Sequence, residues 1–76
     1  MSMRAKKVGP FELEVGDESE IIKNPFSGES VECCPDAVAL YDLIKGAEHI
    51  HDYDTVRKGL DYFSKTWPSE YMMLLD

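Results

Sequence analysis

The fold of this chain is decided by the segment YDTVRKGLDYFSKTW, residues 53–67. Large apolar side chains recur there at alternating intervals of three and four residues, which places them on one face of a helix: Tyr53, Val56, Leu60, Phe63 and Trp67. Two ion pairs are possible between residues four apart, Asp54 with Lys58 and Asp61 with Lys65. In both, the acid comes before the base, which is the favourable order in a helix. Burial of each large apolar side chain contributes about 1.5–3 kcal/mol. We therefore expect this helix to be the main contributor to the core.

A second helical pattern precedes this segment. Apolar side chains again share one face, at Ala37, Leu40, Tyr41, Ile44 and Ala47. Pro35 suits the first turn of a helix, and Asp36 suits the positive end of the helix dipole. The pattern predicts a helix from residue 35 to about residue 45 or 48.

The connections between helices predict how they are arranged. The link at residues 49–52 is short, so the two helices should form an antiparallel αα-hairpin. Gly59 lies on the apolar flank of the later helix, where it either permits a close approach of the neighbour or is merely tolerated. Pro68 ends that helix, and residues 69–75 are predicted to form a short C-terminal helix.

The first half of the chain has the pattern of β-strands. Residues 11–15 alternate between apolar and acidic side chains, which predicts a strand with Phe11, Leu13 and Val15 facing inward. Shorter strands are predicted at residues 21–23 and around Val31 and Cys33, with a turn at residues 24–29 between them. We expect a small antiparallel β-meander or hairpin, which needs a helix across one face to be stable.

Length and composition favour one α+β domain. A chain of 76 residues has little room for a second core, and 43% hydrophobic with 30% charged residues is typical of a folded chain. No apolar run reaches the roughly 20 residues that cross a bilayer, so no membrane association is expected. The adjacent Cys33 and Cys34 form no disulfide framework, and a reducing cytoplasm is the simplest setting.

Charge is distributed unevenly along the chain. Three of the eight basic residues, Arg4, Lys6 and Lys7, lie near the N-terminus. We expect residues 1–9 to form a flexible basic tail and residues 10–76 to form the domain. Beyond the tail, five bases accompany 15 acids, which leaves a net charge of −10. A surface of this charge repels nucleic acid, so the expected partner is a protein, and a basic one.

Two surfaces are candidates for binding that partner. The first consists of acids that project from the predicted strands and turns, Glu12, Glu14, Asp17, Glu18 and Glu20. The second is the C-terminal helix, where apolar side chains such as Tyr71, Met72 and Met73 exceed what a short helix can bury on one side. That helix could also mediate a homodimer. The alternatives are that the acids only keep the protein in solution and that the methionines only complete the core.

The chain contains His, Cys and Asp residues of the kinds found in catalytic and metal sites, but not at the spacings that such sites need. His49, His51 and Asp52 could join Cys33 or Cys34 around zinc, but adjacent cysteines seldom point at one ion and no Cys-x-x-Cys element occurs. Cys34 at a helix start could act as a nucleophile, yet nothing fixes either histidine as its base. We therefore expect a protein that is not an enzyme and that needs no metal or cofactor.

Four segments resemble small uncharacterised proteins encoded by tailed bacteriophages, namely NPFSGE at residues 24–29, AVALYD at 37–42, RKGLDYF at 57–63 and EYMMLLD at 70–76. The resemblance covers the chain from about Ile21 to its end. It implies the cytoplasm of an infected bacterial host, where small acidic proteins often bind host or phage machinery. It carries over no functional residue.

These observations together favour one function over two others. The leading hypothesis is a non-catalytic acidic phage protein that binds and modulates a host protein, one that handles nucleic acid. The alternative is a structural or assembly component that acts as a homo-oligomer or in the phage particle. A small metal-dependent or thiol enzyme ranks third.

Overall fold

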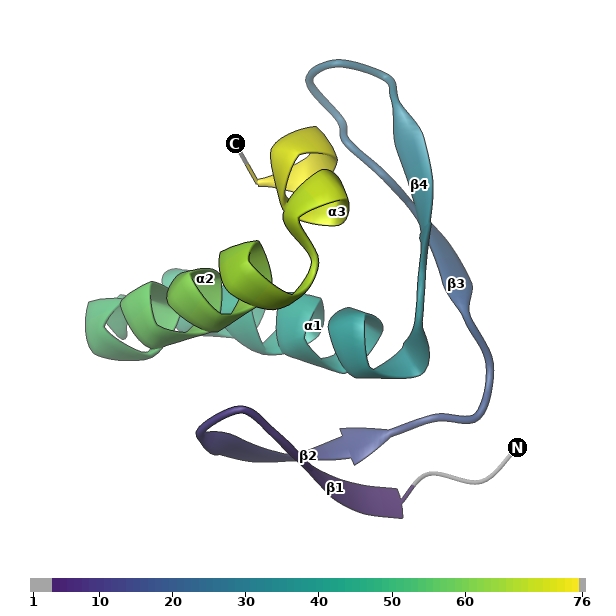
Figure 1. Ribbon diagram of the computed structural model, residues 1–76. Coiled ribbons are helices and arrows are strands. Elements are labelled where there is room, and N and C mark those ends of the chain that lie inside the picture. The colour runs from purple at the N-terminus through teal and green to yellow at the C-terminus, as the bar shows by residue number, and fades with distance from the viewer. Residues whose placement is uncertain (1–3, 76) are drawn as a thin grey trace.

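Two β-hairpins and three helices make up the computed structural model, which describes residues 4–75 (Figure 1). The strands are β1 (Arg4–Val8), β2 (Phe11–Val15), β3 (Glu20–Lys23) and β4 (Ser30–Cys33). The helices are α1 (Pro35–His49), α2 (Tyr53–Thr66) and α3 (Pro68–Leu74). This order confirms the predicted α+β class, and none of these three helices is long and apolar enough to span a membrane.

The N-terminal segment differs most from the prediction. Arg4–Val8, which we expected to be part of a flexible tail, pairs along its whole length with β2, from Arg4 opposite Val15 to Val8 opposite Phe11. Gly9 has a φ of 62°, the positive value that a two-residue hairpin loop needs at its first position. The tail prediction is therefore wrong for residues 4–8, and its residues 1–3 lie outside the described part of the chain.

The sequence of β1 is mostly polar, so contacts with neighbouring elements stabilise this strand. Val8 is buried at 2% exposure, and the Lys6 ammonium lies 2.9 Å from an Asp36 carboxylate oxygen at the start of α1. The three N-terminal bases therefore belong to the folded part, so its net charge is close to the −7 of the whole chain and less negative than the expected −10.

The strands form two separate sheets instead of one meander. Within residues 4–75, β1 pairs with β2 and β3 pairs with β4, both antiparallel, and no strand joins the two pairs. The first hairpin lies against α1 through β2, while β4 of the second hairpin contacts α1 and α3 (Figure 1). The alternation predicted for residues 11–15 is confirmed, because Val15 is buried and Glu12 and Glu14 are exposed.

The two longer helices form the predicted hairpin, but α1 contributes more to the core than α2. Four residues of α1 are buried, compared with Gly59 and Phe63 on α2. The physical reason is position, because α1 contacts α2, β2 and β4 at once. Tyr53, expected in the core, is 62% exposed at the start of α2. The largest fully buried side chains are those of Phe63, Leu40, Ile44, Val8, Val15 and Cys33.

Candidate protein-interaction site

A cleft lies between the connection from β2 to β3 and the first half of α1. Its volume is about 330 Å³. Among the described residues 4–75, five that line it are acidic and none is basic: Glu14, Asp17, Glu18, Glu20 and Asp42. Its remaining lining comes from Gly16 and from Pro35, Val38 and Ala39 of α1. We call this feature the acidic cleft.

The local structure explains how the acids come together. Glu14 is exposed on β2, between the half-buried Leu13 and the buried Val15, and lines the cleft. The chain then bends through residues 16–19 and enters β3 at Glu20, so it crosses beside the first turns of α1. Asp42 lies one turn beyond Val38 on α1 and completes the lining from the helix side.

The two acids of β2 differ in their cross-strand partners. Glu12 lies directly opposite Lys7, so the neighbouring strand supplies an opposite charge. Glu14 lies opposite Ala5, which has no charge to offer. Asp36 lies next to the cleft lining in sequence but forms an ion pair with Lys6. The acid of β2 that lines the acidic cleft therefore has an uncharged cross-strand partner.

The chemistry of the acidic cleft suits a basic side chain. Lysine and arginine have long aliphatic stems, which can lie on apolar surface such as that of Pro35, Val38 and Ala39, while their charged ends remain in contact with polar groups. Carboxylates at the rim are the preferred hydrogen-bond acceptors for both cations. An apolar base with an acidic rim thus matches a short basic segment of a protein.

Four of the five acids predicted to bind a partner meet in this cleft. Glu14, Asp17, Glu18 and Glu20 line it, whereas Glu12 lies outside it. Asp42 was not among the acids predicted to bind a partner. The helical pattern places Asp42 on the exposed side of α1, which marks it as a surface acid. Its position beside the other acids depends on the path of the chain after β2, which the sequence pattern does not reveal.

The C-terminal helix offers less apolar surface than its composition suggested. Met72 is 66% exposed, while Tyr71 and Met73 are half-buried and Leu74 is buried. The Met73 carbonyl accepts a hydrogen bond of 2.7 Å from the Asn24 side chain, which ties α3 to the loop between β3 and β4.

The residues considered for metal or thiol chemistry are far apart. Cys33 and Cys34 precede α1, and His49 ends it, so 15 helical residues at about 1.5 Å each separate them by about 22 Å. Burial raises the pKa of the Cys33 thiol to about 11, and the charge of Glu70 adds to the effect, so this thiol is a poor nucleophile. Among residues 4–75, no three His, Cys, Asp or Glu side chains are grouped to hold a metal ion.

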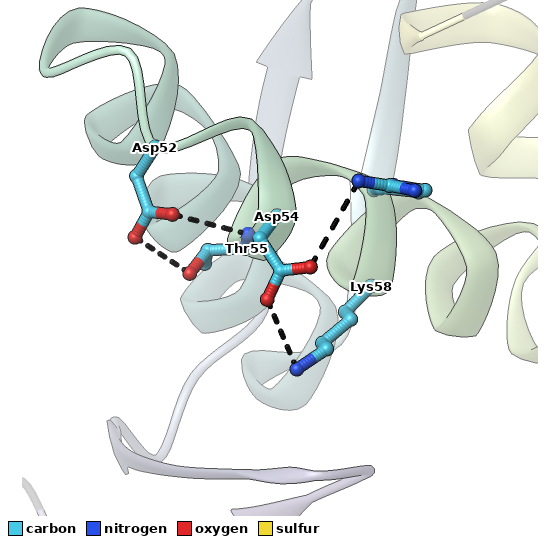
Figure 2. A network of polar contacts seen from close by, with 5 residues as sticks. Asp52, Asp54, Thr55 and Lys58 are labelled. Atoms are coloured by element: carbon cyan, nitrogen blue, oxygen red, sulfur yellow. Dashed lines mark hydrogen bonds and ion pairs between the residues drawn. The ribbon is translucent and has the colours of Figure 1, made fainter.

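A second group of charged side chains, at the start of α2, has a structural role (Figure 2). The Asp52 carboxylate accepts hydrogen bonds from the Thr55 backbone amide at 3.3 Å and from the Thr55 hydroxyl at 2.7 Å, which caps the helix. Asp54 lies 3.1 Å from the Lys58 ammonium and 3.9 Å from the Arg57 guanidinium. Asp52 and Asp54 thus have their hydrogen-bond and ion-pair partners within their own helix.

Comparison of the chain with protein-family models, curated proteins and solved structures finds no match. The interpretation of the acidic cleft therefore depends on its own geometry and charge.

Proposed function

We infer that this protein is a non-catalytic binding protein whose acidic cleft holds a basic segment of a protein partner. The observation that carries this proposal is the gathering of five carboxylates around the apolar floor of the acidic cleft. A net charge of −7 supports a protein partner over direct binding to nucleic acid, whose phosphates it would repel.

The resemblance to tailed-bacteriophage proteins gives the proposal its setting. In the cytoplasm of an infected bacterium, a basic segment on a host protein is most often one that contacts nucleic acid. Occupation of that segment by the acidic cleft would compete with the nucleic acid and so modulate the host protein. The same charges would also speed the encounter through electrostatic steering.

The second candidate function is an assembly component that acts as a homo-oligomer. The observation that favours it is the set of exposed large apolar side chains, among them Phe26 at 98% and Met72 at 66%. Such side chains suit protein contacts other than those of the acidic cleft.

A pull-down with matched charge reversals tests the leading proposal. The double variant Glu14→Lys with Glu18→Lys reverses two acids of the cleft, and Glu29→Lys with Glu32→Lys makes the same change in net charge on exposed positions elsewhere. Each variant and the wild-type protein serve as bait in a bacterial lysate, and mass spectrometry identifies the captured proteins. We expect a basic partner with wild type and with the control variant, and its loss with the cleft variant.

Two results would contradict the proposal. Equal capture by the cleft variant would place the binding surface elsewhere on the molecule. Recovery of only this protein itself, or of phage particle proteins, would favour the assembly function instead.

A further inference from the structure

The loop between β3 and β4 presents one aromatic ring to solvent. Phe26, in the middle of residues 24–29, is 98% exposed, the highest value of any large apolar side chain among residues 4–75. Neither hairpin pairing nor the core requires an aromatic residue there, because the ring contacts neither. The loop that carries it is nevertheless well ordered by hydrogen bonds.

Asn24 organises this loop. Its side-chain oxygen accepts hydrogen bonds from the Phe26 amide at 2.8 Å and the Ser27 amide at 3.4 Å. Its backbone carbonyl accepts from the Gly28 amide at 2.9 Å, and its backbone amide donates to the Glu29 carbonyl at 2.7 Å. Gly28 adopts a φ of 79°, which other residues rarely do. These bonds fix the backbone on both sides of the ring.

The loop is also fixed relative to the helices. The Asn24 side-chain amide donates a 2.7 Å hydrogen bond to the Met73 carbonyl of α3. An aromatic side chain on a rigid support loses little conformational entropy when it binds, which is the property of an interface anchor. The backbone that carries Phe26 is thus held in place before any partner arrives.

A second cleft opens beside this ring. It has a volume of about 400 Å³, and Asn24 and Phe26 are among its lining residues. Its apolar lining also includes Ile44 of α1, Leu60 of α2, Leu74 of α3 and Leu75, which follows α3. We call it the helix cleft. An apolar cavity of about 150 Å³ suffices to hold a benzene ring in an engineered lysozyme, so the helix cleft has room for a phenylalanine side chain.

The charge around the helix cleft permits two copies of the chain to meet there. Among residues 4–75, the charged residues that line it are Lys45 and Glu48, which form an ion pair of 3.5 Å and cancel each other. The acidic cleft, by contrast, has five acids and would repel its own copy. For a chain with a net charge of −7, the helix cleft is therefore the favoured face for self-association.

We propose that two copies of this protein form a two-fold dimer in which the Phe26 ring of each enters the helix cleft of the other. Because Phe26 lies at the edge of its own cleft, a two-fold axis near that edge brings each ring over the opposite cleft. The two contacts are then identical, as in an isologous interface. This assembly is independent of the function proposed for the acidic cleft, which stays open in the dimer.

Sedimentation equilibrium at micromolar concentration tests the proposal. We expect the wild-type chain to be a dimer and Phe26→Ala to raise the dissociation constant at least tenfold, since an anchor aromatic is removed from both contacts. Ile21→Ala is the matched control, because Ile21 is also exposed, at 74%, but does not line the helix cleft. It should leave the dissociation constant unchanged.

Mixing two variants makes the test specific for this geometry. Leu75→Glu places a charge in the helix cleft, so this variant and Phe26→Ala should each be monomeric alone. A heterodimer of the two keeps one intact ring and one intact cleft, so the mixture should associate more strongly than either variant. Circular dichroism checks the fold of Leu75→Glu, and Phe26→Ala changes an exposed side chain only.

Three results would overturn the proposal. The first is a wild-type chain that stays monomeric, and the second is a Phe26→Ala variant that dimerises as strongly as wild type. The third is a monomeric chain that captures a different protein through Phe26, which would assign the ring to a hetero-partner.

Discussion

Gly59 of α2 approaches Ile44 of α1 so closely that a Cβ atom at position 59 would lie 2.7 Å from the Ile44 Cγ1 atom. Such a distance is well inside van der Waals contact, and Ile44 is 1% exposed and cannot move aside freely. Of the two roles that the sequence left open for Gly59, the structure supports the close approach of the two helices.

The first prediction is that Gly59→Ala destabilises the protein. Alanine favours a helix over glycine by about 1 kcal/mol, but overpacking of a buried contact costs about 1–3 kcal/mol. We expect a net loss of about 1 kcal/mol in the free energy of unfolding, measured by chemical denaturation. Gly46→Ala is the control, because its added Cβ would meet no atom of the described residues within 4 Å apart from its chain neighbours and the backbone of its own helix, and it should stabilise α1 by about 0.5–1 kcal/mol. Equal effects at both positions would show that the helices do not meet at Gly59.

The second prediction concerns β1, the strand that the sequence did not predict. Val8 is 2% exposed, so Val8→Asp would bury an unpaired charge and should lower the free energy of unfolding by at least about 2 kcal/mol. Lys7→Asp, one position earlier on the exposed face, should cost less than half of that. If residues 4–8 were a flexible tail, neither substitution would change the melting curve.

The sequence predicts most of the elements because their signals are local. The spacing of Leu60 and Phe63 on α2 and the alternation along β2 each need only a few neighbouring residues to be recognised. β1 was missed because its sequence, RAKKV, has one large apolar residue, and its stability comes from β2 and from the Lys6–Asp36 ion pair. Its pairing is a property of tertiary structure.

The same distinction applies to the acidic cleft. Glu14 and Glu18 could be selected from the sequence because exposed strand and turn positions are readable from pattern. Asp42 and the apolar base of the cleft could not, because their place depends on where the chain after β2 crosses α1. The periodicity of the sequence does not show where the chain passes α1. The shape of the acidic cleft can therefore be recognised only in the three-dimensional structure.

The third prediction links Cys33 to stability at high pH. Burial raises the pKa of this thiol from 9.0 to about 11, with a further contribution from the charge of Glu70. As pH rises, the unfolded chain therefore loses the thiol proton before the folded chain does. The contribution of this thiol to the free energy of unfolding is fully present below about pH 9 and is lost between about pH 9 and 11. This group should contribute a loss of about 2 kcal/mol by pH 11. Cys33→Ala, compared with wild type by urea denaturation across this range, should have a smaller decline, and parallel curves would contradict the assignment.

The last prediction follows from the charge of the acidic cleft. Attraction between exposed charges is screened over about 8 Å at physiological ionic strength, so affinity for a basic partner should fall steeply between low and high salt. Most of the fall should come from slower association, since steering acts before contact. Surface plasmon resonance with the captured partner, or with a lysine- and arginine-rich peptide as a probe, measures both rates.

The two double variants separate the acidic cleft from the total charge of the chain. Glu14→Lys with Glu18→Lys should slow association and flatten the salt dependence, because it removes carboxylates that face the bound cation. Glu29→Lys with Glu32→Lys changes the net charge equally from positions outside the cleft lining, so it should have the smaller effect. Equal slowing by both variants would mean that only the overall charge attracts the partner. If binding were insensitive to salt and to both reversals, the carboxylates would serve to keep the protein in solution, and recognition would belong to an apolar surface such as the helix cleft.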